Sequence, residues 1–321
     1  MKNMFMIKQE TTAERASLAR RLSDRMGRNW SDRLFPFMMI APILILFCVF
    51  VVYPFAQGFI ASFHKWDGLS DMEWLGLRNY ENTLKDPLFW SAMKNTFVYA
   101  ILVTVFKNIF ALLLAMFLIR KRLPGRTLFR TAIYLPVTMS YVVIGVLWMW
   151  IFNPSFGLLN PLLTFLGLES WIQGWLSDPE VAIYSVIWVD IWKWTGFHMV
   201  MYVAGLNAIP SEYYEAAAID GTNGWQRFWK ITFPQLNSTI FTNVLMSITG
   251  AFTSNYALVN VMTGGGPNNS TEVAATYIVK TGLKYVNLGK ANAMTFILFL
   301  FTLAFGIIQL KTIVKDDNYG N

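Results

Sequence analysis

The sequence is poor in charged residues, in cysteine and in histidine, and we find no internal repeat in it. Charged residues make up 14% of the 321 positions, whereas soluble domains carry about 25%, so an ordinary soluble domain is excluded. The single cysteine, Cys48, excludes an internal disulfide. Together with only two histidines it leaves little material for a soft-metal site, and we predict none.

Patterns of catalytic residues are missing as well. The sequence contains no Gly-x-x-x-x-Gly-Lys-Ser/Thr, the loop that cradles ATP phosphates. The run 264–267 (Gly-Gly-Gly-Pro) lacks the lysine and predicts a turn. Glu215 and Asp220 lie five residues apart in a polar segment, which argues against an acid–base pair. We therefore predict that the chain is not an enzyme and binds no cofactor of its own.

Long apolar runs are abundant instead, since 55% of the residues are hydrophobic. A helix that crosses a bilayer needs about 20 apolar residues. Runs that meet this length are 34–63, 96–119, 131–152, 181–206, 240–262 and 293–310. The sequence predicts an all-α polytopic membrane protein with six transmembrane helices in one membrane domain, 34–312. Residues 1–33 and 313–321 form tails.

The basic residues cluster at the ends of these runs. If the N-terminus is cytoplasmic, the inner segments 1–33, 120–130, 207–236 and 311–321 hold 17 Lys and Arg, and the outer segments hold 7. This bias follows the positive-inside rule and predicts that both termini are cytoplasmic. It also explains the net charge of +7, so nucleic acid is not a predicted partner. Since the first apolar run starts late and is long, 1–33 is interpreted as a retained tail.

A polar, helix-forming loop, 207–236, separates the fourth and fifth runs. Pro210 can begin a helix, because its missing N–H is not needed in the first turn. Gly221 can end that helix, because glycine tolerates positive φ. A second helix with an apolar face follows, and Pro234 is predicted to end it. These residues alone leave open whether the loop merely links two spans or binds a partner.

This loop resembles the EAA loop in the membrane subunits of binding-protein-dependent ABC importers. The resemblance is carried by Glu215-Ala216-Ala217, Asp220-Gly221, Phe228, Ile231 and Phe233-Pro234, where Phe233 replaces the usual leucine. Other segments of the chain are similar to further signatures of sugar-type permeases. They are Thr263-Gly264-Gly265-Gly266-Pro267 with Ser270-Thr271, Leu288-Gly289-Lys290-Ala291-Asn292-Ala293, Asn79-Tyr80, Asp86-Pro87 and Asn95-Thr96. The resemblance covers about residues 34–312.

The resemblance implies a subunit of a carbohydrate importer in a bacterial or archaeal cytoplasmic membrane. A second permease subunit would complete the pathway, and an external binding protein would deliver the sugar. Two cytoplasmic ATPase subunits would hold ATP and Mg and would bind the loop. In this loop Glu215 would make the polar contact, Ala216 and Ala217 would pack closely, and Gly221 would form the bend. Asp220 is also expected among the residues that couple to the ATPase.

Polar groups inside the fourth run are candidates for the substrate pathway, because they are costly in a membrane. Asp190 and Trp194 lie four residues apart and can share a helix face that offers a carboxylate and an aromatic ring. Alternatively, Asp190 pairs with Lys193 for structural reasons. A different class also remains possible, an autonomous channel or secondary carrier that uses Asp190 and Lys193 as a charge relay.

The fifth run adds further pathway candidates. Ser247, Ser254 and Asn255 could bond sugar hydroxyls or could bond neighbouring helices. In the sugar-permease family the fourth and fifth spans line the pathway, so the resemblance implies the first role. Lys107 and Asn108 in the second run are weaker candidates.

Overall fold

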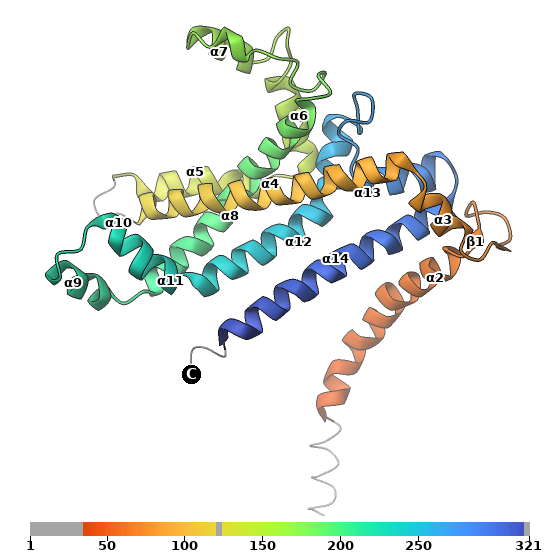
Figure 1. Ribbon diagram of the computed structural model, residues 1–321, viewed down its shortest axis with the longest axis horizontal. Helices are drawn as coiled ribbons and strands as arrows, with labels where there is room; N and C mark the ends of the chain where they lie inside the picture. Colours follow the sequence, from red (N-terminus) through yellow and green to blue (C-terminus); the bar gives the residue numbers. More distant parts are fainter. Residues whose placement is uncertain (1–34, 120–123, 318–321) are drawn as a thin grey trace, which may run out of the picture. The chain divides into compact units, whose positions relative to one another are not determined.

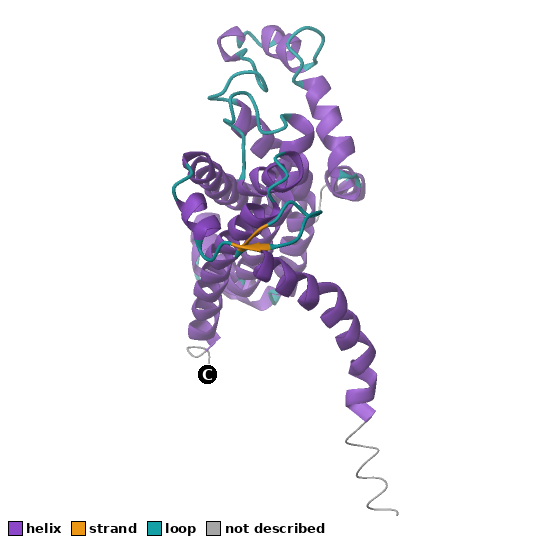
Figure 2. Ribbon diagram, turned by 90° about the vertical axis from the view of Figure 1, so that its right-hand side faces the viewer, coloured by secondary structure: helices purple, strands orange, loops and turns teal. Residues whose placement is uncertain are grey.

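The computed structural model describes residues 35–119 and 124–317 (Figures 1 and 2), without the side chains of 253, 254 and 308–317. Most of the described part is helical. The strands found there are two residues long, β1 (His64–Lys65) and β2 (Glu73–Trp74), and they pair antiparallel. The architecture agrees with the predicted all-α class. The tail 1–33 lies outside the described residues.

The chain forms two compact units, and the first ends at residue 60. Its described part belongs to one apolar helix, Phe35–Ala61, which includes a π-helical turn, η1 (Cys48–Val52), and α2 (Tyr53–Ala61). The wide turn comes directly before Pro54, whose ring would clash with a regular α-helical turn. The helix is apolar along its length, which suits a segment that crosses a membrane.

Three long helices form the core of the second unit: α4 (Pro87–Leu118), α8 (Ala182–Ala208) and α12 (Asn237–Met262). They pack against one another, and α14 (Leu288–Asp317) lies along α12 (Figure 1). The start of α4 follows from its sequence. The Asp86 carboxylate accepts hydrogen bonds from the backbone N–H groups of Leu88 and Phe89, and Pro87 occupies the first helical position.

These long helices overlap the apolar runs expected at 96–119, 181–206, 240–262 and 293–310. By length and apolar composition, three described helices can cross a membrane: Phe35–Ala61, Pro87–Leu118 and Leu288–Ile307. A fourth is added if the bent pair described next counts as one span. Helices α8 and α12 are 27 and 26 residues long, but they are not among the helices that reach this apolar composition. The six-span topology therefore stays a prediction.

The run at 131–152, expected as one continuous helix, is broken into two. Helix α5 (Arg126–Thr138) and α6 (Tyr141–Ile151) meet at an angle of 106°. Pro136 lies inside α5, and Ser140 caps α6 by accepting a hydrogen bond from the backbone N–H of Val143. The break is also supported from α8, because the Lys193 ammonium donates to three backbone carbonyls at 2.7–3.2 Å, those of Pro136, Val137 and Met139.

Helices α5 and α8 approach each other closely enough for their backbones to touch. A Cβ atom on Gly196 of α8 would lie 2.2 Å from the carbonyl oxygen of Ile133 in α5. Any side chain at position 196 would therefore push the two helices apart.

Short elements connect the long helices of the second unit. At one end α3 (Arg78–Leu84), α13 (Ala274–Val279) and η4 (Lys280–Lys284) contact α14, whereas α7 (Leu159–Phe165) and η2 (Glu169–Trp171) follow α6 (Figure 1). The other end carries α9 (Ser211–Ile219), α10 (Gly224–Arg227), η3 (Phe228–Thr232) and α11 (Phe233–Gln235). Elements α10, η3 and α11 follow one another without a gap, and this helical stretch ends at Gln235, one residue after Pro234 and close to the predicted end. Helix α12 follows almost at once.

Signature residues far apart in the sequence meet at the first of these ends. The Asn95 amide donates to the carbonyls of Ser270 and Glu272, both at 2.9 Å. The Asp86 carboxylate accepts from Tyr277 Oη at 2.7 Å and from Lys290 Nζ at 2.6 Å. Burial alone would raise the pKa of Asp86, but these two hydrogen bonds and the charge of Lys290 lower it below its usual value.

Candidate functional site

The loop after α8 is built from two short helices joined at Gly221. Helix α9 ends at Ile219, and Gly221 takes φ of +72°. Nothing lies within 4 Å of the place a Cβ would occupy there, so glycine is required by the backbone angle and not by space. The backbone N–H and the hydroxyl of Thr222 both donate to the carbonyl of Ala217, which closes the end of α9.

The second helix is fixed by a reciprocal cap and by a bond to α9. Asn223 Oδ1 accepts from the backbone N–H of Gln226 at 2.8 Å, and Gln226 Oε1 accepts from the backbone N–H of Asn223 at 3.0 Å. The hydroxyls of Tyr214 and Thr232 are hydrogen-bonded at 3.0 Å, so the two helices form one connected element.

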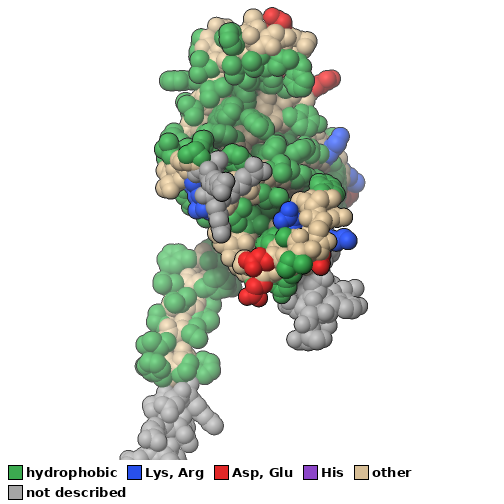
Figure 3. Space-filling model, turned by 90° about the vertical axis from the view of Figure 1, so that its left-hand side faces the viewer, with side chains coloured by type: hydrophobic (Ala, Val, Ile, Leu, Met, Phe, Trp, Pro, Cys, Tyr) green, Lys and Arg blue, Asp and Glu red, His purple; other side chains and the backbone are tan. Residues whose placement is uncertain are grey.

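Most of the predicted coupling residues lie on the outside of this element. Glu215, Ala216, Asp220 and Gly221 are exposed, whereas Ala217 is buried. Figure 3 views the molecule from the side of α9 and shows acidic side chains gathered beside basic ones, close to apolar surface. The loop therefore offers carboxylates and small side chains outward, while Ala217 packs inward.

A chain of buried hydrogen bonds joins α4, α8 and α12. Asn108 donates to Ser247 Oγ at 3.0 Å and accepts from Tyr202 Oη at 2.8 Å. His198 contacts Asn243 Oδ1 through Nδ1 at 2.7 Å and Ser247 Oγ through Nε2 at 3.3 Å. Since Asn243 Oδ1 can only accept, His198 Nδ1 donates to it. These side chains hold the three core helices together.

A second buried cluster is charged. Lys107 Nζ lies 4.0 Å from Asp190 Oδ2, and the two side chains are 3% and 0% exposed. Tyr99, also buried, interacts with Asp190. Lys193, the partner that the sequence offered for Asp190, donates instead to the carbonyls at the α5–α6 break and lies 5.0 Å from the Tyr141 ring centre. The close cation of Asp190 is thus Lys107.

A groove opens between α4, α6, α8 and α12, next to this cluster. Its volume is about 470 Å³, within the range of roughly 300–1,000 Å³ typical of small-molecule pockets. It is lined by Lys107, Tyr141, Trp194, Phe197, His198, Leu245, Met246, Thr249 and Gly250. Trp194 Nε1 donates to Tyr141 Oη at 2.5 Å, which fixes the indole in the wall.

The structure separates the predicted pathway residues into two groups. Trp194 lines the groove, whereas Asp190, Ser247 and Asn255 are fully buried behind or beside it. Both amide atoms of Asn255 lack a hydrogen bond from the described residues. Ser254 belongs to α12, but its side chain lies outside the described part.

Sequence reasoning gave little weight to Lys107 and none to Tyr141, yet both line the groove. For Lys107 the sequence did offer an indication, because a lysine inside an apolar run is a candidate for a functional site. No local pattern marks Tyr141, which starts a helix and enters the groove through its contact with Trp194.

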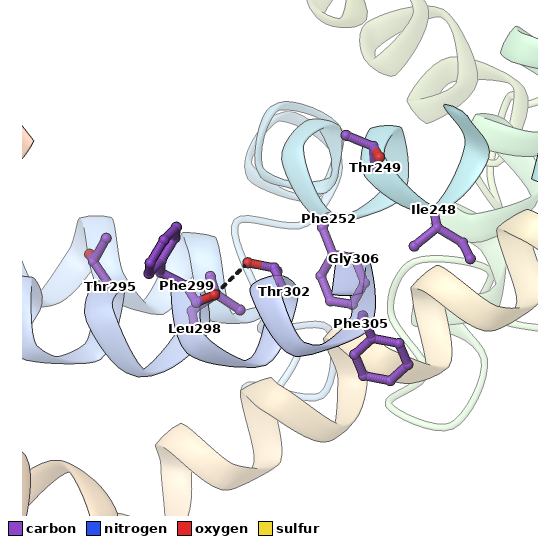
Figure 4. Close-up of a pocket in the computed structure, with 9 residues that line it drawn as sticks. All are labelled: Ile248, Thr249, Phe252, Thr295, Leu298, Phe299, Thr302, Phe305 and Gly306. Carbon is purple, nitrogen blue, oxygen red and sulfur yellow. Dashed lines mark hydrogen bonds between the residues drawn. The ribbon is translucent and has the colours of Figure 1, made fainter. Parts of the chain in front are cut away.

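A different groove lies between α12 and α14 and is apolar (Figure 4). It measures about 350 Å³, and the rings of Phe252, Phe299 and Phe305 contribute to its wall. Its threonine hydroxyls bond carbonyls of their own helices, as Thr302 does with Phe299 at 2.9 Å. This groove therefore offers few polar groups to a ligand. Among the described residues, no cluster of three or more His, Cys, Asp and Glu could hold a metal.

The apolar helices and the lined groove define a membrane transport component. Comparison with known proteins agrees: residues 107–310 match the family described as "Binding-protein-dependent transport system inner membrane component". The chain belongs to this family, so it is a membrane permease subunit.

Curated relatives match over nearly their whole length. The protein "Probable ABC transporter permease protein YurN" of Bacillus subtilis is 35% identical, with 87% of this chain and 96% of that protein covered. The sn-glycerol-3-phosphate transport system permease protein UgpA of Agrobacterium fabrum is 32% identical, with 90% and 98% covered. "Probable starch degradation products transport system permease protein AmyD" of Thermoanaerobacterium thermosulfurigenes is 30% identical, with 91% and 98% covered.

A solved structure shares the fold. A chain of a bacterial ABC transporter involved in the import of the acidic polysaccharide alginate superimposes with a TM-score of 0.77 at 25% identity. The alignment covers 91% of this chain and 98% of that one.

Proposed function

We propose that this chain is one of two permease subunits of an ABC importer for a carbohydrate or a related polyol compound. An external binding protein delivers the cargo, and two cytoplasmic ATPase subunits, which hold ATP and Mg, drive its passage. The relatives named for glycerol phosphate and for starch products support this cargo class. In this proposal six helices cross the cytoplasmic membrane, and both termini are cytoplasmic.

One observation carries the coupling role: an exposed, internally bonded helix pair is attached directly to both core helices that line the groove. Helix α8 ends at Ala208 and α9 begins at Ser211, so two residues separate them. At the other side α11 leads into α12 with one residue between them. A displacement of α9 by an ATPase would therefore reach α8 and α12, with Glu215 and Asp220 as polar contacts.

The pathway is proposed to follow the groove between α4, α6, α8 and α12. The indole of Trp194 offers a flat face on which a sugar ring can stack. Asp190 would act through Lys107, and Ser247 would hold the helices that form the wall. Ser254 and Asn255, further along α12, would extend the pathway.

The coupling proposal is tested with Glu215→Lys in the importer reconstituted in liposomes. We expect ATP-driven uptake to fall by more than about tenfold, because a cation replaces the proposed carboxylate contact in a partner cleft. Glu212→Lys, on the same helix and equally exposed, is the matched control and should retain most of the uptake. Unchanged uptake by Glu215→Lys, with the chain inserted normally, would refute the role of Glu215.

A second candidate, an autonomous carrier with an Asp190–Lys193 relay, is less well supported. Lys193 already donates to the carbonyls at the α5–α6 break, and a relay would have to release them. The two functions differ in one measurement. The carrier predicts transport by the purified chain alone without ATP, and the importer subunit predicts none.

A further inference from the structure

The wall of the α4–α8–α12 groove contains a buried cation. Lys107 is 3% exposed and lines the cavity, where its neighbours on the wall include the aromatic rings of Tyr141, Trp194 and Phe197. Removing an ammonium from water costs several kcal/mol unless partners replace the water. The partners of Lys107 therefore decide what the groove can bind.

The pairing of Lys107 with Asp190 is incomplete. A hydrogen-bonded ammonium–carboxylate pair has an N···O distance of about 2.7–2.9 Å, whereas Lys107 Nζ and Asp190 Oδ2 are 4.0 Å apart. Neither Asp190 oxygen accepts a hydrogen bond of normal geometry from the described residues. An ammonium has three N–H donors. Lys107 thus keeps donor capacity on the side that meets the cavity.

The charges around the groove do not cancel. Two cations, Lys107 and Lys193, interact with one carboxylate, Asp190. His198 donates from Nδ1 to Asn243 Oδ1 and adds no negative charge. The tyrosines nearby, Tyr99 and Tyr141, are uncharged hydroxyls. Hydrogen bonds to three carbonyls solvate the Lys193 ammonium without neutralising it. The cluster therefore carries a net positive charge, and Lys107 is the cation of this cluster that lines the groove.

Building on the proposed function, we propose that this groove is a subsite for an anionic group on the cargo. The ligand is a polyhydroxy compound with a carboxylate or a phosphate ester. Lys107 donates to the anion and Trp194 packs against the carbon skeleton, while Asp190 positions Lys107. The other groove, between α12 and α14, has no charged lining residue and serves as the internal comparison.

The test measures protection of an introduced cysteine in the purified importer complex without its binding protein. In a Cys48→Ser background, Met246→Cys places a thiol in the Lys107 groove, and Thr302→Cys places one in the apolar groove. The rate of maleimide labelling is measured in the presence of a uronate trisaccharide and, separately, of a neutral trisaccharide with the same linkage. A second pair of ligands, glycerol 3-phosphate and glycerol, is compared in the same way. The first pair tests recognition of a carboxylate, and the second tests recognition of a phosphate ester.

We expect both ligands to slow labelling at position 246, and the acidic one to do so at about tenfold lower concentration than its neutral counterpart. A hydrogen bond to a charged group contributes about 1.5–3 kcal/mol, which corresponds to a difference in affinity of at least this size. Position 302 should respond equally to both. Lys107→Arg should keep the preference. Lys107→Met combined with Asp190→Asn removes both charges without leaving a buried carboxylate unpaired, and it should abolish the preference.

Equal protection by acidic and neutral ligands, no protection by either, or an unchanged preference in the double variant would overturn the anionic subsite. These outcomes are distinct from failure of the proposed function, which is judged by ATP-driven uptake in the same preparation. A complex that imports neutral sugars and shows no acidic preference supports the importer and refutes the subsite.

Discussion

Lys193 has a role that its position inside an apolar run did not reveal. Its ammonium satisfies three carbonyls at the end of α5, and a cation at a helix C-terminus is also favoured by the helix dipole. A buried carbonyl without a partner costs about 1–3 kcal/mol. The lysine therefore stabilises the α5–α6 break, and the three carbonyls in turn stabilise its buried ammonium.

We predict that Lys193→Met destabilises the protein by about 2 kcal/mol or more, because the carbonyls of Val137 and Met139 lose this donor. The Pro136 carbonyl still accepts from the backbone N–H of Met139 at 3.3 Å. Thermal unfolding of the purified complex, followed by loss of the monodisperse peak, measures the effect. Lys284→Met, at a surface position in η4, is the control and should leave the unfolding temperature nearly unchanged. Equal unfolding temperatures for both variants would refute this role of Lys193.

At the scale of single elements, local signals predicted the helix ends well. Pro210 and Gly221 act on their own backbone neighbours, and the structure uses each of them at or beside a helix end. The start of α4 at Pro87 was not predicted, since the apolar run there begins only at 96. The break at 139–140 was not predicted, because its support comes from α8, more than 50 residues away. Pro136 alone was compatible with a mild kink in a continuous helix.

The contact of α5 with α8 yields a prediction for Gly196. A Cβ there would meet the Ile133 carbonyl oxygen at 2.2 Å, so Gly196→Ala should lower the unfolding temperature and the yield of folded protein, although alanine is the better helix former. Gly306→Ala in α14, where nothing lies within 4 Å, should be neutral or stabilising. A stabilising effect at position 196 would show that the helices are separable.

At the scale of the whole molecule, the sequence predicted the class of protein but not the pairing of its buried charges. Lys107 and Asp190 are 83 positions apart, and which cation meets the carboxylate depends on how α4 and α8 are rotated against each other. Apolar helices with low amphipathicity do not fix this rotation. For the same reason, Trp194 was recognised as a pathway candidate but its partner Tyr141 was not.

The proposed topology gives a whole-molecule prediction. In a Cys48→Ser background, Ser155→Cys should react with a membrane-impermeant maleimide in intact spheroplasts, because it lies in a proposed outer loop. Ser211→Cys should react only after permeabilisation, because α9 is proposed to be cytoplasmic. Both serines are exposed, so accessibility within the chain does not limit the reaction. Labelling of both from outside would contradict the six-span arrangement.

The close contact between α5 and α8 also has a mechanical consequence. Because the two backbones touch at Gly196 and Ile133, α5 must follow when α8 shifts, and the pair behaves as one stiff body. Helix α6 packs mainly on α12 instead. The extended residues Met139 and Ser140 join these two bodies. A shift of α8 and α5 relative to α6 would therefore bend the chain at these two residues, against the bonds from Lys193 and Trp194 that hold the joint to α8.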